Sequence, residues 1–176
     1  PENLNSISDN GIWALFEDRN GNIWIGTKAG WLDKYNPETE KFTHWEIKSD
    51  FTEENSITAI YENSKGNIWI GTYKDGLYRL VPSTNEIDHW STNTNDAKSL
   101  SHNYVHDICE DNDGNILIGT HIGLNKFNPD SPKDGFEKFF FNPVNLKSLS
   151  NNLIWGISKS VSHPNDVWIC TLNNLT

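Results

Sequence analysis

The sequence lacks methionine, has only two cysteines and contains no long run of apolar residues. None of its stretches reaches the roughly 18 consecutive apolar residues of a membrane-spanning helix, so we expect no direct membrane insertion. The chain opens with Pro1 and shows neither an initiator methionine nor a secretory leader. We therefore expect it to be a piece of a longer protein.

Basic residues are also scarce. The sequence has 14 Lys and Arg against 24 Asp and Glu, which gives a net charge of −10. This excludes nucleic acid as a partner, because phosphate binding requires a basic stripe that the sequence does not have. Cys109 and Cys170 both lie in apolar, strand-like runs. We expect small buried thiols rather than a disulfide, although their redox state, and with it the compartment, stays open.

Aromatic residues, by contrast, are plentiful: they make up 12% of the chain and include 8 Trp. A disordered chain would be poor in them, so this chain folds. The heptapeptide GNIWIGT occupies residues 21–27 and recurs unchanged at 66–72, with the variants GNILIGT at 114–120 and NDVWICT at 165–171. A period of about 45 residues is typical of propeller blades or helical arrays. The run IWIGT is β-branched and aromatic, and no stretch has a helical period, so the sequence predicts a propeller.

Each repeat divides into four predicted strands. The first strands are residues 12–17, 57–62, 105–110 and 154–159, and Asx-Gly turns connect them to the IWIGT strands. The third strands are near 31–35, 76–80 and 123–127. We expect them to end before Pro37, Pro82 and Pro129, because proline cannot donate to the strand ladder. The fourth strands are 42–45, 87–90 and 136–139.

The predicted fold is therefore all-β, a β-propeller fragment of about three and a half four-stranded blades. Residues 1–176 form one partial propeller, with blade boundaries at about 6–50, 51–97, 98–146 and 147–176, the last blade having two strands that end near Leu172. The repeated aromatic position is expected to lie between neighbouring sheets: Trp24, Trp69, Trp168 and, as a substitute, Leu117. A small residue inside the first strand, as at Ala14, Ala59 and Gly156, fits crowding near the propeller axis, with Asp107 as the exception.

The repeats resemble the two-component regulator propeller repeats. The resemblance rests on NGIWALFEDRNGNIWIGT at residues 10–27, on GWLDKYNP at 30–37, and on the elements SIS at 6–8 and SLS at 99–101 and 148–150. It returns in three to four repeats and covers nearly the whole chain. The sequence departs from the pattern at Trp31 and Cys170, where glycine is usual, and at residues 160–164.

This resemblance implies a segment of the periplasmic or extracellular sensor region of a hybrid two-component system histidine kinase. It implies an open part of a propeller of about seven blades, a response to carbohydrate fragments, and a histidine kinase elsewhere in a membrane-anchored parent protein. The open end blades are expected to be covered either by the remaining blades of the parent propeller or by another copy of the chain.

Candidate ligand-binding residues lie in the loops that follow each IGT triplet, because these loops vary while the frame is constant. Trp31 and Tyr73 are suited to stacking on a sugar ring, Lys28, Lys74 and Asp75 to bonding hydroxyls, and the two lysines also to acidic groups. His121 occupies the same loop of the third repeat. His106 shares one first-strand position with Trp13, Thr58 and Trp155; we expect that position to be inter-blade core, with a channel-facing ring as the alternative.

No catalytic residue, metal site or cofactor is predicted. His44 and His89 occupy equivalent positions, as do Asn10, Asn55, Asn103 and Asn152, which we interpret as loop-closing amides rather than ligand contacts. Glu17, Glu62 and Glu110 are interpreted as turn partners. Two alternatives stay open. The blades are loosely similar to those of streptogramin lyases, in which case His106 and His121 would be the residues to test, and a purely structural or interaction module is the third interpretation.

Overall fold

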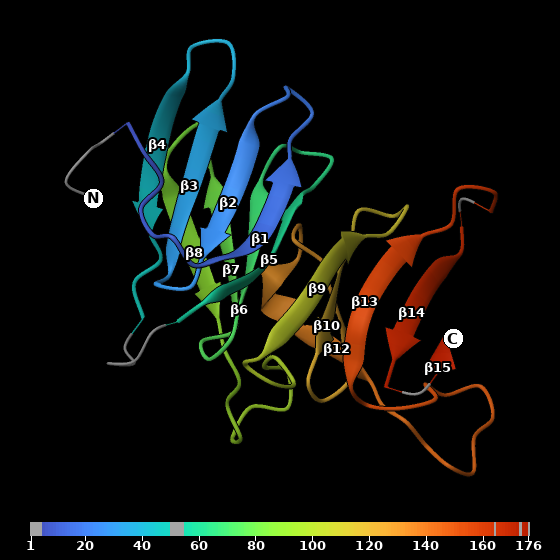
Figure 1. The fold of residues 1–176 in the computed structure, drawn as a ribbon. Helices are drawn as coiled ribbons and strands as arrows, with labels where there is room; N and C mark the ends of the chain where they lie inside the picture. Colours follow the sequence, from blue (N-terminus) through green and yellow to red (C-terminus); the bar gives the residue numbers. More distant parts are fainter. Residues whose placement is uncertain (1–4, 50–54, 164, 173, 176) are drawn as a thin grey trace.

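The computed structural model describes residues 5–49, 55–163, 165–172 and 174–175, and within them the chain forms four antiparallel sheets in chain order (Figure 1). We call the sheets blades 1 to 4. Blade 1 contains β1 (Ile12–Glu17), β2 (Ile23–Thr27), β3 (Trp31–Asn36) and β4 (Lys41–Glu46). Blade 2 contains β5 (Ile57–Glu62), β6 (Ile68–Thr72), β7 (Leu77–Val81) and β8 (Glu86–Trp90).

Blade 3 contains β9 (Val105–Glu110), β10 (Ile116–Thr120), β11 (Leu124–Phe127) and β12 (Phe136–Phe139), with the short 3-10 helix Pro132–Asp134 before β12. Blade 4 contains β13 (Ile154–Lys159), β14 (Val167–Thr171) and β15 (Asn174–Leu175). The prediction of two strands ending near Leu172 is therefore wrong by one strand, because β15 pairs with the end of β14. The predicted all-β propeller fragment is confirmed.

The first strands of neighbouring blades lie side by side, β1 against β5, β5 against β9 and β9 against β13 (Figure 1). The second glycine of each heptapeptide, in the IGT triplet, packs against the first strand residue of the next blade. A Cβ added at Gly26 would lie 2.5 Å from Ile57 Cγ2, and one at Gly71 would lie 2.5 Å from Val105 Cγ1. Ala14 and Ala59 crowd the same two glycines. Blades approach so closely here that the repeat needs glycine, which explains why this letter recurs.

Three hydrophobic cores form between the blades rather than within them. Trp24 packs with the blade 2 residues Ile57, Ile60 and Ile68 in the first core, and Trp69 packs with Val105, Ile108 and Phe127 in the second. Leu117 takes the equivalent place against blade 4. Each blade has two apolar faces and buries them only against its neighbours, as the repeat pattern predicted.

The last member of the repeated aromatic series behaves differently. Trp168 was expected between sheets but is 47% exposed, because it lies on the face of blade 4 that no other described blade covers. Cys170, on the same strand, is exposed as well, whereas Cys109 is buried. The expectation of two buried thiols is thus confirmed for Cys109 and wrong for Cys170, and both are free thiols.

Hydrogen bonds between hairpin turns and the next blade supplement the apolar cores. Glu62 accepts from the backbone N of Arg19 at 2.9 Å, and Glu110 accepts from the backbone N of Ser64 at 2.8 Å. These two carboxylates therefore hold the turn of the preceding blade, which confirms their interpretation as turn partners. At the equivalent position of blade 4, Lys159 replaces the glutamate.

The turn after the first strand contains a polar acceptor that differs between blades. In blade 1, Asp18 accepts from Asn22 Nδ2 and, at 2.9 Å, from the indole Nε1 of Trp24. In blade 2, Asn63 stands at that position. Its Nδ2 and the indole Nε1 of Trp69 are both buried without a hydrogen-bond partner among the described residues. The single amide oxygen of Asn63 cannot accept all the hydrogen bonds that the two carboxylate oxygens of Asp18 accept in blade 1.

Replacing Asn63 by aspartate is therefore expected to stabilise the protein by about 1–2 kcal/mol, because the new carboxylate removes one orphan donor and accepts from the other. Chemical denaturation of the two proteins measures the difference. The reverse change in blade 1, Asp18→Asn, serves as the matched control and should destabilise by a similar amount. An unchanged or lower stability of the Asn63→Asp protein would show that the two buried donors cost nothing.

Candidate functional site

A β-bulge interrupts the first strand of every blade at the same repeat position. The β1–β2 ladder pairs Ile12 with Thr27 and then Ala14 with Gly26, so Trp13 has no partner. Equivalent register shifts leave out three further residues, namely Thr58, His106 and Trp155. A bulge turns the extra side chain out of the regular alternation, and bulges are frequent beside functional sites.

These bulges decide where the side chains point. Trp13 is 49% exposed and Trp155 is 51% exposed, and neither belongs to an inter-blade core. The expectation that this position is inter-blade core is therefore wrong, and the alternative of a ring facing the channel fits the structure. The strand alternation assumed from the sequence does not hold at a bulge.

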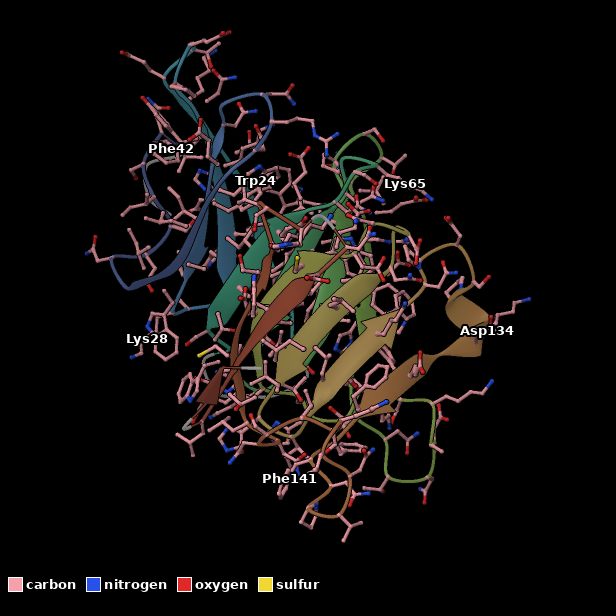
Figure 2. The ribbon with its side chains drawn as sticks, turned by 90° about the vertical axis from the view of Figure 1, so that its right-hand side faces the viewer. Trp24, Lys28, Phe42, Lys65, Asp134 and Phe141 are labelled. Atoms are coloured by element: carbon pink, nitrogen blue, oxygen red, sulfur yellow. The ribbon has the colours of Figure 1, made fainter. Side chains whose placement is uncertain are left out.

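The loops that follow the IGT triplets are fixed beside these bulges by one recurring hydrogen bond. The backbone N of Tyr73 donates to Ser56 O at 2.9 Å, and that of His121 donates to Tyr104 O at 3.0 Å. Lys28 makes the same bond to Gly11 O at 2.6 Å. Figure 2 shows Lys28 at the lower end of the sheets, whereas Lys65, in the turn between β5 and β6, lies at the upper end. The loop residues and the bulges therefore share one end of the propeller.

Aromatic and imidazole rings from all four blades meet at this end. Tyr73 lies 6.3 Å from Trp13 and 4.6 Å from Tyr104, measured between ring centroids. His106 stacks on Tyr104 at 4.0 Å and lies 4.6 Å from Trp155. We call these five residues the aromatic row. It runs without interruption from blade 1 to blade 4, so an extended ligand has a continuous set of ring surfaces to contact.

A pocket of about 530 Å³ opens beside the row between blades 2 and 3. Its lining residues are Tyr73, Lys74, Thr92, His102, Asn103, Tyr104 and His121. His121 also lies beside His106, with Nδ1 3.4 Å from its Nε2. The structure thus brings together four predicted site residues, Tyr73, Lys74, His106 and His121. His102 and Tyr104 were not predicted as site residues. Their position just before the first strand of blade 3 is the feature of the sequence that could have indicated them.

Three predicted residues lie outside this group. Lys28 lies at the same end of the propeller but does not line the pocket. The other two are Asp75 and Trp31. Asp75 is only 4% exposed; its carboxylate accepts from Tyr78 Oη at 2.5 Å and lies 3.4 Å from His89 Nε2. Trp31 begins β3, and its backbone N donates to Thr27 Oγ1. Neither lines the pocket. Their ligand-binding role stays a prediction, and the structure gives Asp75 an internal partner instead.

The asparagine that recurs before the first strand of each repeat closes a loop. Asn103 Oδ1 accepts from the backbone N of Thr92 at 2.7 Å, Asn152 Oδ1 from that of Phe141 at 2.7 Å, and Asn55 Oδ1 from that of Lys74 at 3.2 Å. The predicted loop-closing role is confirmed for these three. His44 and His89 likewise serve the frame, since they bond Asp33 and the carbonyl of Asp75.

Three segments of the chain match the family described as two component regulator propeller: residues 6–29, 53–74 and 99–121. They coincide with the beginning of blades 1, 2 and 3 and include every intact IWIGT or ILIGT strand. The chain carries two-component regulator propeller repeats. Comparison with curated proteins gives no significant match.

Solved structures share the fold of these regulator propeller repeats. The extracellular domain of the putative hybrid two component system BT4673 from B. thetaiotaomicron is 24% identical with a TM-score of 0.77, over 94% of this chain and 21% of that chain. That of BT3049 from the same organism is 23% identical with a TM-score of 0.69, over 97% and 20%. Virginiamycin B lyase from Staphylococcus aureus is 15% identical with a TM-score of 0.69, over 92% and 49%. The chain therefore spans about a fifth of the length of the two-component ectodomains.

A larger cavity of the regulator propeller fragment, about 1230 Å³, lies elsewhere, between blades 3 and 4. Its apolar wall contains Leu117, Leu124, Val167 and Ile169. Between blades 2 and 3 the equivalent space is filled by Phe127 and Phe136 from the two outer strands of blade 3. In blade 4, β15 is a two-residue strand, and no fourth strand is present among the described residues. This cavity therefore corresponds to the space that outer-strand side chains fill between blades 2 and 3.

The described residues contain neither a helix long and apolar enough to cross a membrane nor a group of three His, Cys, Asp or Glu side chains arranged to hold a metal ion. The imidazoles near the regulator propeller's pocket are nonetheless electrostatically coupled. Burial, followed by the neighbouring His121 and His102, lowers the pKa of His106 from 6.5 to about 4. Burial and then His121 also lower the pKa of His102. Both rings are therefore neutral near pH 7.

Stability is expected to fall as the pH drops from 6.5 toward about 4, because the unfolded chain then binds a proton that folded His106 resists. The pKa of His106 is lower in the folded protein than in the unfolded chain, so the protein is most stable above pH 6.5 and loses stability as the pH falls below it. Unfolding measured in denaturant across this range tests the expectation, and His106→Asn should flatten the slope. Asp18 and Asp111, whose pKa values lie below 3.8 because hydrogen bonds outweigh burial, act only at lower pH. An unaltered slope in the His106→Asn protein would contradict this assignment.

Proposed function

We propose that this chain is a ligand-sensing segment in the extracellular or periplasmic region of a hybrid two-component regulator, and that carbohydrate fragments bind along the aromatic row. The observation that carries the proposal is the continuity of the aromatic row: bulges turn Trp13, His106 and Trp155 outward, and the rings of Tyr73 and Tyr104 lie between them. Sugar rings have apolar C–H faces that pack well on aromatic rings. The regulator repeats and the fold shared with two-component ectodomains support the sensing role.

The mechanism of such a segment requires no chemistry of its own. A ligand that contacts rings from several blades favours the arrangement of the ectodomain in which those rings are correctly placed. Its differential affinity for two arrangements of the ectodomain biases the kinase on the other side of the membrane. Kinase activity therefore belongs to another part of the parent protein.

Calorimetric titration of the complete ectodomain with a panel of glycan fragments tests the proposal. At least one fragment should bind, and the variants Trp13→Ala and Trp155→Ala should each weaken its binding about tenfold or more, since a lost stacking partner costs of the order of 1.4 kcal/mol. Lys65→Ala is the control, because the Lys65 side chain is 52% exposed and lies at the opposite end of the propeller (Figure 2). Silence across a broad panel, or equal losses in all three variants, would argue against the proposal.

A lyase-like propeller enzyme is the second candidate. It is favoured by one observation, the 3.4 Å approach of His106 Nε2 to His121 Nδ1 at the same end of the propeller. Virginiamycin B lyase shares the fold at 15% identity, and that degree of similarity carries the fold alone. Turnover of a lyase or hydrolase substrate that disappears in His106→Ala would favour this candidate. Turnover that is absent from the complete propeller would remove it.

The two open end faces need a partner, and we propose that remaining blades of the parent propeller cover them. Ile12 and Leu15 are exposed on blade 1, and Trp168 on blade 4. A head-to-tail second copy would bring Ile12 onto Cys170. Each internal interface has a glycine at the position of Cys170, because a Cβ there would lie within 2.6 Å of the next blade. The Cys170 side chain would therefore clash with the second copy. Light scattering coupled to size-exclusion chromatography separates the alternatives: a concentration-dependent dimer would favour the second copy.

A further inference from the structure

The loop between β12 and β13 and the loop between β8 and β9 share one hydrogen-bonded frame. Before blade 4, the backbone N of Asn142 donates to Ser148 Oγ at 2.9 Å, and Ser148 Oγ donates to Asn142 O at 3.0 Å. Before blade 3, Asn93 and Ser99 make the same two bonds, both at 3.0 Å. The frame fixes the conformation of each loop, so the side chains that it does not use are presented on a rigid support.

Two positions of this frame carry very different side chains in the two loops. Before blade 3 they are Asn95 and Ala97, whereas before blade 4 they are Val144 and Leu146, which we call the apolar tip. Val144 is 89% exposed and Leu146 is 100% exposed. They follow three exposed phenylalanines along the chain, Phe139, Phe140 and Phe141. The same frame forms with polar or small residues, so folding does not require the apolar ones, and clustered apolar side chains in water indicate a contact site.

Further strands of blade 4 do not account for the apolar tip. Blade 3 has all four strands, yet Asn95 and Ala97 are exposed in the loop that leads into it. Val144 and Leu146 occupy the same two positions in the loop that leads into blade 4, so strands added to that blade leave them in water. Phe141 differs, since it also lines the cavity between blades 3 and 4. The apolar tip therefore needs a partner from outside the blades.

The apolar tip belongs to the same end of the propeller as the candidate ligand site. Figure 2 shows Phe141, in the same loop, at the lower end of the sheets with Lys28, and in Figure 1 the loop between β12 and β13 extends below the strands. A lipid surface is an unsuitable partner there, because insertion of the tip would turn the end that carries the aromatic row toward the headgroups and hinder ligand access. A protein surface can contact the tip and leave the row open.

The size of the apolar tip favours a partner in the same polypeptide. Two aliphatic side chains and their neighbours bury far less than the roughly 800 Å² per partner of a specific interface between separate proteins. A contact inside one polypeptide needs less area, because the linkage supplies a high effective concentration and removes much of the entropy cost of association. The two-component ectodomains that share this fold offer such a partner, since this chain covers only 21% and 20% of their lengths.

We propose that the apolar tip packs into an apolar hollow of another domain of the same parent ectodomain. The inference rests on the proposed function, which places this chain in such an ectodomain, and it adds the internal contact that holds the ligand end of the propeller against its neighbour. Val144 and Leu146 provide the buried surface. The frame already fixes their loop, so docking costs little conformational entropy.

Thiol alkylation of the complete ectodomain tests the contact. Leu146→Cys places a small thiol in the apolar tip, and Ala97→Cys places one at the matched position of the polar loop. Both changes are made in a Cys170→Ser background, because Cys170 is exposed whereas Cys109 is buried. In the native protein, Leu146→Cys should react about tenfold or more slowly than Ala97→Cys. In denaturant the two rates should agree, because the difference comes from the fold.

A second pair of variants makes the result independent of the loss of Leu146: Val144→Cys should be protected relative to Asn95→Cys in the same way. Equal rates within both pairs would overturn the inference. Protection that disappears on dilution would assign the tip to a second copy, and protection that appears only with phosphatidylglycerol vesicles would assign it to a membrane; either result overturns the inference as well. Protection in an ectodomain that binds no fragment of the glycan panel would leave the contact standing and remove the sensing proposal.

Discussion

Replacing Trp69 by alanine is expected to lower the free energy of unfolding by about 4 kcal/mol. Trp69 is 0% exposed and lies between blades 2 and 3, with its ring 5.6 Å from that of Trp90 and 5.9 Å from that of Phe127. The change removes apolar surface from the second inter-blade core and leaves a cavity that two neighbouring sheets cannot close. Denaturant unfolding, followed by circular dichroism or by the fluorescence of the remaining indoles, measures the loss.

The matched control is Trp168→Ala, since Trp168 has the same repeat position on blade 4 but lies on an open face. It should cost less than about 1 kcal/mol. The contrast measures the contribution of the neighbouring blade, because both tryptophans occupy the same position in the second strand of a blade. Similar losses in the two variants would mean that the tryptophan stabilises its own sheet, and the inter-blade core would lose its assigned role.

The second large effect is expected for Gly71→Ala, which should destabilise by about 3 kcal/mol through overpacking. A Cβ at this position would lie 2.5 Å from Val105 Cγ1, 2.9 Å from Val105 Cβ and 3.2 Å from Ala59 Cβ. The first strand of blade 3 has to move away from β6, which loosens the second core along its length. Adding Val105→Ala should recover only part of the loss, because the Cβ of residue 105 remains in place.

Gly156→Ala is the control for this change. Gly156 lies in the first strand of blade 4, and a Cβ there would be 3.7 Å from the nearest atom, which is ordinary contact. Its substitution should be neutral or slightly stabilising, since alanine reduces the freedom of the unfolded chain. A neutral Gly71→Ala protein would show that blades separate easily, and the tight approach would then not explain why the heptapeptide repeats its glycine.

Much of the framework was predictable from the sequence because each repeat contains its own local signals. The β-branched IWIGT strand, the Asx-Gly turn before it and the proline after the third strand all act within a few residues. The Asn103 and Asn152 loop closures were predictable for the same reason. The part of the candidate site formed by loops, Tyr73, Lys74 and His121, was found because these residues vary on a constant frame.

The channel-facing position was only the alternative prediction, after inter-blade core, because a bulge changes which face a strand residue occupies. Trp13 and Trp155 look like core residues to any reasoning that assumes strict alternation. His102 and Tyr104 were missed because they carry no motif; they become part of a pocket only when the loop of blade 2 lies beside the start of blade 3. Asp75 was predicted to face a ligand because it lies in a loop, but its carboxylate is buried and accepts a hydrogen bond from Tyr78.

By itself, then, the sequence determined the strands, the turns and the repeated packing surface, since these depend on neighbouring residues and on a period that four copies display. Tertiary structure alone decided which rings meet, that one pocket collects side chains of two blades, and that Trp168 and Cys170 face outward while their counterparts are covered. The physical reason is that burial and convergence belong to pairs of blades, and a repeat read singly does not contain its neighbour.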